Sequence, residues 1–113
     1  MKSKRQPTHR SLPPAKLDEM IEEATVDANG ESEQVTGFFT LLEEQIKVPF
    51  KTEMLGMTVT VEELELTDDE QIVTVCSRGK SRQRVPILDL PLPDPPPEGW
   101  EWIEAFRRWA RGR

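Results

Sequence analysis

The chain changes its hydrophobic period at Pro49-Phe50, and this change limits how it can fold. Before the change, apolar residues recur every three or four positions, which is the spacing of one helical face. After it, apolar and polar residues alternate, as they do in strands that bury one face. Helical segments followed by strand segments predict an α+β fold.

Two helices are predicted before the change of period. The first begins at Pro14 and should end near Asn29-Gly30, because glycine adopts the left-handed conformation that closes a helix at little cost. The second follows directly and should end before Pro49, since proline disfavours helical geometry at the residue before it. Two helices joined by so short a turn should pack as an antiparallel hairpin. The apolar faces are formed by Leu17, Met20, Ile21 and Ala24, and by Val35, Phe38, Phe39, Leu42 and Ile46.

Three strands are predicted after the change. They cover Met57–Val61, Gln71–Cys76 and Gln83–Leu88, and a turn at Arg78-Gly79-Lys80 joins the last two. This order predicts a small antiparallel sheet, either open or closed into an SH3-like barrel. The helical hairpin should pack on this sheet.

The two ends differ from the centre in composition. Residues 1–14 are basic and contain three prolines, so we interpret them as a disordered arm before a domain over residues 15–90. Five prolines in residues 91–99 predict a stiff, extended connector, and residues 100–113 have the apolar spacing of a short helix. Trp102, Phe106 and Trp109 of that helix can dock on the domain or bind another chain, and docking is the preferred interpretation.

Charge and residue content exclude several functional classes. Residues 11–106 hold seven basic and all 21 acidic residues, a net charge of −14 that should repel nucleic acid. No apolar run approaches the roughly 18 residues of a membrane span, and the N-terminal residues lack a signal-peptide pattern. A single cysteine, Cys76, favours the reducing cytoplasm. Because His9 is the only histidine and no nucleotide-binding motif is present, we expect a binding protein rather than an enzyme.

Carboxylate oxygen is the chemistry that remains, and it suits calcium, a hard cation satisfied by six to eight oxygen ligands. The sequence does not contain an EF-hand. A loop starting at Asp27 has Ser32 in place of the turning glycine and Phe38 in place of the bidentate glutamate. Composition alone leaves open whether the acidic clusters are ion sites or merely solvated surface.

The segment 25–50 resembles the opening of the CcbP-type calcium-binding protein family of cyanobacteria. The likeness lies in Val26-Asp27-Ala28, Glu33-Gln34, Gly37-Phe38, Leu42-Glu43 and Pro49-Phe50. A later match, Arg84-Val85-Pro86-Ile87, extends it to about residues 20–109. The resemblance implies a small α+β domain that holds calcium with surface carboxylates and has no EF-hand.

The resemblance also suggests candidate metal ligands. The matching acidic positions are Asp27, Glu31, Glu33 and Glu43, and we add Asp68 and Asp69 for their charge alone. The expected function is calcium binding as a buffer or sensor. The alternative is a protein–protein interaction module whose ion site has been weakened or lost.

Overall fold

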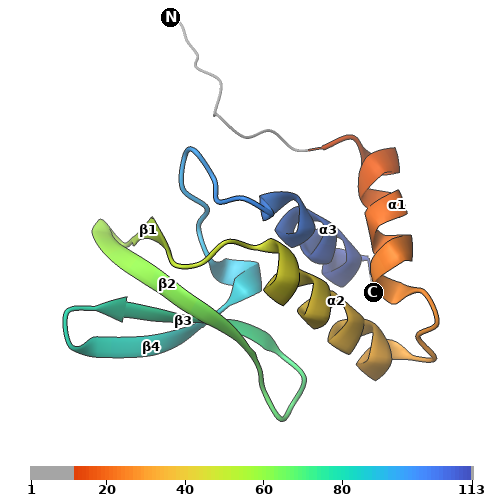
Figure 1. Ribbon diagram of the computed structural model, residues 1–113, viewed down its shortest axis with the longest axis horizontal. Coiled ribbons are helices and arrows are strands. Elements are labelled where there is room, and N and C mark those ends of the chain that lie inside the picture. The colour runs from red at the N-terminus through yellow and green to blue at the C-terminus, as the bar shows by residue number, and fades with distance from the viewer. Residues whose placement is uncertain (1–11, 113) are drawn as a thin grey trace, which may run out of the picture.

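The computed structural model describes residues 12–112, so the expected arm over residues 1–14 lies almost entirely outside the described residues. Figure 1 shows three layers: an outer helix at the right, two helices in the middle, and a curved sheet at the left. The outer helix is α1 (Pro14–Thr25), and the middle layer holds α2 (Glu31–Gln45) and α3 (Trp100–Arg111). The predicted α+β class, with N-terminal helices and a short C-terminal helix, is confirmed.

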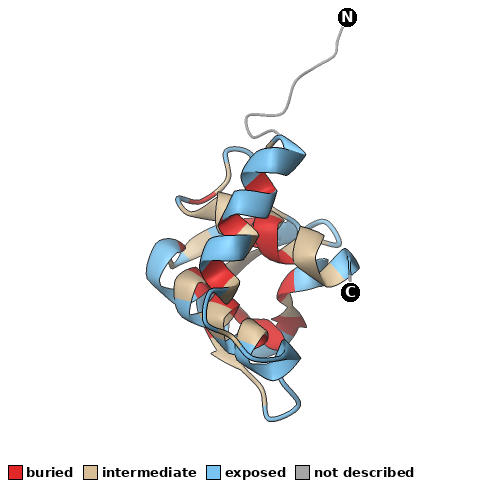
Figure 2. Ribbon diagram, turned by 90° about the vertical axis from the view of Figure 1, so that its right-hand side faces the viewer, coloured by how far each residue is buried: buried red, intermediate tan, exposed pale blue. Residues whose placement is uncertain are grey.

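The helix α1 ends five residues before the predicted Gly30 stop. Val26 is extended, with φ −60° and ψ 138°, and Asp27 has a φ of 67°, a left-handed conformation that aspartate tolerates better than most residues. The turn to α2 therefore spans residues 26–30. Buried and exposed residues alternate along α1 in Figure 2, as expected for a helix that buries one side.

Gly37 determines how closely α1 and α2 approach each other. A Cβ atom at this position would lie 2.3 Å from the carbonyl oxygen of Ala24 on α1, far inside van der Waals contact. The absence of a side chain allows the two backbones to touch at this point.

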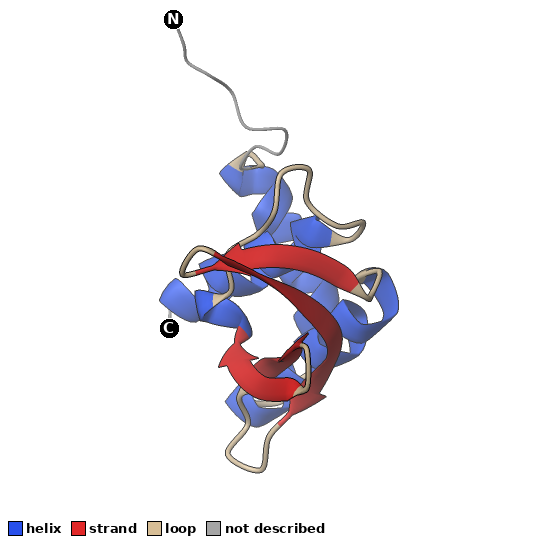
Figure 3. Ribbon diagram, turned by 90° about the vertical axis from the view of Figure 1, so that its left-hand side faces the viewer, coloured by secondary structure: helices blue, strands red, loops and turns tan. Residues whose placement is uncertain are grey.

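The sheet is an antiparallel meander with strand order β1-β2-β3-β4. Its strands are β1 (Phe50–Met54), β2 (Met57–Leu66), β3 (Ile72–Arg78) and β4 (Ser81–Pro86). The strand β1 was not predicted. The expected strand Gln83–Leu88 forms as β4, but it ends at Pro86 and is followed by a 3-10 helix, η1 (Ile87–Asp89). Because β1 and β4 stand at opposite ends of the strand order, the sheet is open and no SH3-like barrel is closed (Figure 3).

A β-bulge in β2 keeps the inner face of the sheet apolar. Val61 pairs with Cys76, and after the register shift between Val61 and Glu63, Leu64 pairs with Thr74. Val61 and Leu64 are three residues apart, so in a regular strand they would face opposite sides. The extra residue of the bulge lets both point inward, where both are buried.

The main core lies between the three helices and the ends of β2 and β3 that the β2–β3 turn joins. Phe38 of α2 is fully buried and contacts both Phe106 and Trp109 of α3, with ring centroids 5.3 and 5.4 Å apart. The extended segment after η1 thus brings α3 back onto the domain, and its aromatic residues form part of the core.

A second, smaller core covers one half of the inner face of the sheet. Val61, Cys76 and Val85 form its floor, and Leu90, from the segment after η1, packs over them. Arg107 of α3 secures this covering segment by donating hydrogen bonds from Nη2 to the carbonyl oxygens of Ile87, at 2.8 Å, and Leu90. Burial lowers the pKa of the Arg107 guanidinium below its usual range.

Candidate metal centre

The α1–α2 turn carries three of the predicted ligands. Asp27 is exposed in the turn, while Glu31 and Glu33 stand in the first helical turn of α2, where the helix dipole favours negative charge. The Oε1 atom of Glu33 accepts a hydrogen bond from the backbone N–H of Asn29 at 2.9 Å. Glu33 therefore already stabilises the helix start, which occupies one of its two carboxylate oxygens.

The β2–β3 turn carries Asp68 and Asp69 and is held by its own hydrogen bonds. The backbone N–H of Gln71 donates to the hydroxyl of Thr67 at 3.0 Å, and that hydroxyl donates to the carboxylate of Asp69. Glu70 closes the turn with a φ of 67°, an unusual conformation for glutamate. The turn is thus a fixed scaffold with exposed acidic side chains.

These two acidic segments are far apart in the chain but adjacent in space. The hydroxyl of Ser32, in the first turn of α2, donates a hydrogen bond of 2.6 Å to Oε2 of Glu70. This contact joins residues 38 positions apart, at the end of the molecule where α2 begins and β2 turns into β3 (Figure 1). We call this surface the acidic junction, defined by Asp27, Glu31, Glu33, Asp68, Asp69 and Glu70.

Glu43 lies outside the acidic junction. It follows Glu31 by twelve residues on the same helix, a distance of about 18 Å along the axis. One ion cannot bind both carboxylates, so any site at Glu43 would be a separate one near the C-terminus of α2.

The acidic junction fits a hard cation in its chemistry and only partly in its arrangement. Its exposed carboxylates, hydroxyls and turn carbonyls are the oxygen donors that calcium prefers. Within residues 12–112, however, no three acidic, histidine or cysteine side chains stand close enough to hold a metal ion. The structure joins the two segments through Ser32 and Glu70 but does not show their carboxylates converging on one point.

Sequence reasoning missed the Ser32–Glu70 contact. Glu70 belonged to a recognised acidic run, but nothing local in the sequence pairs it with a serine at the start of α2. Asp89 of η1 was also missed. It lines a hollow of about 420 Å³ together with Asp69, Glu70 and the core residue Phe106.

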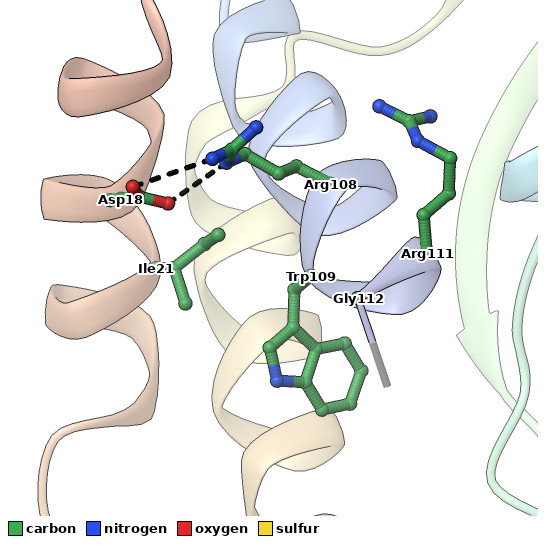
Figure 4. Close-up of a pocket in the computed structure, with 6 residues that line it drawn as sticks. All are labelled: Asp18, Ile21, Arg108, Trp109, Arg111 and Gly112. Carbon is green, nitrogen blue, oxygen red and sulfur yellow. Dashed lines mark hydrogen bonds and ion pairs between the residues drawn. The ribbon is translucent and has the colours of Figure 1, made fainter.

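Another hollow, of about 480 Å³, lies between α1 and α3 and does not have the character of a metal site (Figure 4). An ion pair crosses it, with Nε of Arg108 at 2.8 Å from Oδ1 of Asp18. This carboxylate raises the pKa of the Arg108 guanidinium through its hydrogen bond and its charge. We interpret the ion pair as a link that joins α1 to α3.

Comparison with known proteins defines the fold. No protein-family model matches the sequence, and no curated protein matches it significantly. Two solved structures do share its architecture, and both resemble it over nearly their whole length. The chain has the CcbP-like α+β fold.

The first structure is described as a calcium-binding protein in the calcium-binding form. It has a TM-score of 0.69 and 20% sequence identity, and the match covers 86% of this chain and 91% of that one. The second is CcbP from Anabaena, with a TM-score of 0.66 and 21% identity, and the match covers 89% of this chain and 94% of that one.

No helix among residues 12–112 is long and apolar enough to cross a membrane.

Proposed function

We propose that this protein binds calcium at the acidic junction, without an EF-hand, and acts as a calcium buffer or sensor. The observation that carries the proposal is the Ser32–Glu70 hydrogen bond, which places acidic residues from two distant segments on one surface. The fold supports it, because one structure with this fold was solved in a calcium-binding form.

The arrangement of the side chains suggests how the ion would bind. The side chains of Asp27, Glu31, Asp68 and Asp69 are exposed, so a cation can reach their carboxylates from solvent, and the carboxylate of Asp69 is already oriented by the Thr67 hydroxyl. Without an ion their mutual repulsion favours separated positions. Calcium would draw them together, with the turn at residues 67–71 as the fixed half of the site.

The remaining features fit a binding role in a reducing compartment. Cys76 is buried and unpaired, so the fold does not depend on a disulfide, and we propose the cytoplasm as its location. His9 is the only histidine of the chain, and the sequence contains no nucleotide-binding motif. Calcium is therefore proposed as the ligand, not as a catalytic cofactor.

Calorimetric titration of chelator-treated protein with calcium tests the proposal directly. We expect saturable heat at near-physiological salt that persists in excess magnesium, because screening removes loose ion clouds but not a coordinated ion. The double variant Asp69→Asn, Glu70→Gln should weaken binding at least tenfold. A wild-type protein with no saturable heat would contradict the proposal.

Glu43→Gln serves as the matched variant on the same helix. Unchanged binding would assign the site to the acidic junction alone. Loss of one equivalent of calcium, with the remaining affinity unchanged, would assign a second site near the C-terminus of α2.

The alternative function is a protein–protein interaction module with a weakened ion site. The lack of three converging carboxylates within residues 12–112 is the observation that favours it. It predicts that the chelator-treated protein binds a partner as well as the calcium-loaded protein does.

A further inference from the structure

Half of the inner face of the sheet has no covering element. Strand register places Met54, Met57 and Val59 on the same face as Cys76, since Met54 pairs with Met57 and Val61 pairs with both Phe50 and Cys76. Leu90 covers this face near Val61 and Val85 but does not extend to the hairpin ends. What remains is a groove of about 240 Å³ between the β1–β2 and β3–β4 turns.

The two walls of this hairpin groove differ in chemistry. The wall from β1 and β2 is apolar and consists of Met54, Met57 and Val59. The wall from β3 and β4 is polar and is formed by Arg78, Ser81 and Gln83, with Cys76 at the base. A ligand that fills the groove must therefore present an apolar side and a polar side.

Leu55, at the rim of the groove, exposes an apolar side chain and has an unfavourable backbone conformation. Its side chain is 96% exposed, and its φ of 52° belongs to a two-residue turn that favours asparagine or glycine at this position. The neighbouring Met57 is 44% exposed. Exposed apolar side chains held in strained backbone are common where a protein binds a partner, and methionine adapts its shape to different ligands.

Charge indicates the polar group of the ligand. Arg78 ends β3 and Lys80 lies in the β3–β4 turn, and neither forms an ion pair within residues 12–112. Glu53 lies nearby in sequence but pairs with Thr58 on the opposite face of the sheet. The acidic junction stands at the other end of the strands, because the β2–β3 turn lies opposite the two hairpin turns. The hydroxyl of Ser77, which also lines the groove, donates to the Glu62 carboxylate, so the two cations Arg78 and Lys80 outnumber the one carboxylate that is bonded to a groove residue.

We propose that the hairpin groove binds a short segment of a partner protein that combines a large apolar side chain with a neighbouring carboxylate. The apolar side chain would pack on Met54, Met57 and Val59, with Leu55 folding over it, and the carboxylate would pair with Arg78. This site is separate from the acidic junction and requires no calcium.

Selection from a phage-displayed library of random 12-residue peptides, in the presence of chelator, tests the proposal. We expect enriched peptides that share a large apolar residue next to aspartate or glutamate. Synthetic copies should bind the wild-type protein and lose at least tenfold in affinity with Arg78→Glu. Leu55→Asn should also weaken binding while it raises the melting temperature, since asparagine suits the turn. The matched control is Leu88→Asn, which changes an exposed leucine on η1 outside the groove and should leave affinity unchanged.

Three results would overturn the proposal. The first is no enrichment over an unrelated target, and the second is enrichment of peptides without carboxylates. The third is a wild-type dimer in analytical ultracentrifugation that Leu55→Asn converts to monomer, which would assign the groove to a second copy of the chain. Because the selection contains chelator, failure of calcium binding does not affect any of these results.

Discussion

Single residues connect the layers of this small domain, and Arg107 is the clearest example. Its guanidinium is partly buried and bonds two carbonyl groups of the segment that covers the second core. The charge is retained at a desolvation cost, and its Nε atom has no hydrogen-bond partner in the described structure. Arg107 therefore stabilises the fold mainly because it donates hydrogen bonds to two carbonyl groups that would otherwise lack a partner.

Replacing Arg107 with methionine should therefore destabilise the protein. The aliphatic stem is approximately preserved, but the carbonyl groups of Ile87 and Leu90 lose their donor, which costs about 1–3 kcal/mol in the free energy of unfolding. Urea denaturation measures the change. Arg111→Met, at an exposed position on the same helix, should have little effect. Equal losses in the two variants would show that the hydrogen bonds contribute nothing.

At the scale of elements, close packing of α1 on α2 depends on a position without a side chain. Gly37→Ala would place a methyl group 2.3 Å from the Ala24 carbonyl oxygen, so α1 must shift away from α2. We expect a loss of about 1–3 kcal/mol in unfolding free energy, as for overpacked cores. Gly112→Ala is the matched control, since a Cβ atom there has no neighbour closer than 3.5 Å. Hydrogen exchange in α1 should quicken only in the Gly37 variant.

The outer face of the sheet is stabilised by an ion pair that depends on pH. Nε of Arg84 on β4 lies 2.7 Å from Oε1 of Glu65 on β2, and this hydrogen bond lowers the pKa of Glu65 below its ordinary value of 4.5. A lowered folded-state pKa means that the contribution is complete above about pH 4.5 and is lost as pH falls through the folded-state pKa.

The stability difference between wild-type protein and Arg84→Gln should accordingly be present at pH 7 and shrink below about pH 4.5. It should be small, because the Arg84 side chain is largely exposed and the Glu65 side chain is partly exposed to solvent. Urea denaturation across the pH range measures it. Glu65→Gln should remove the pH dependence of that difference, and a difference that persists unchanged at pH 3 would refute the assignment.

Elements that are defined by local interactions could be predicted from the sequence, whereas features that depend on contacts between distant segments could not. The helices and the β3–β4 turn were predicted because periodicity, proline and glycine act locally. The end of α1 was not, since the left-handed Asp27 depends on how α1 meets α2. The bulge that turns both Val61 and Leu64 inward is set by pairing with β3. The Ser32–Glu70 contact depends on the whole fold, so only the acidic content of the candidate site could be predicted.

At the scale of the whole molecule, the described fold separates the two proposed binding surfaces. The acidic junction lies where α2 begins, and the hairpin groove lies at the opposite end of the strands. A cation at one end and an acidic segment at the other would not compete for the same residues.

If calcium binds at the acidic junction, it should stabilise the protein. Because the protein is acidic, a charge-matched control variant is needed to separate coordination from general charge screening. An ion that binds only the folded state adds about 2.7 kcal/mol at a concentration 100 times its dissociation constant, which raises the melting temperature of a domain of this size by roughly 10 °C or more. With a net charge of −6, any divalent cation also relieves general repulsion.

Two variants with the same charge change separate these effects: Asp69→Asn with Glu70→Gln at the acidic junction, and Glu22→Gln with Glu23→Gln on exposed α1 positions. A coordinated ion predicts that only the junction variant loses the calcium shift and that magnesium does not reproduce it. If both variants lose the shift equally, charge screening explains the stabilisation and the acidic junction is not a calcium site.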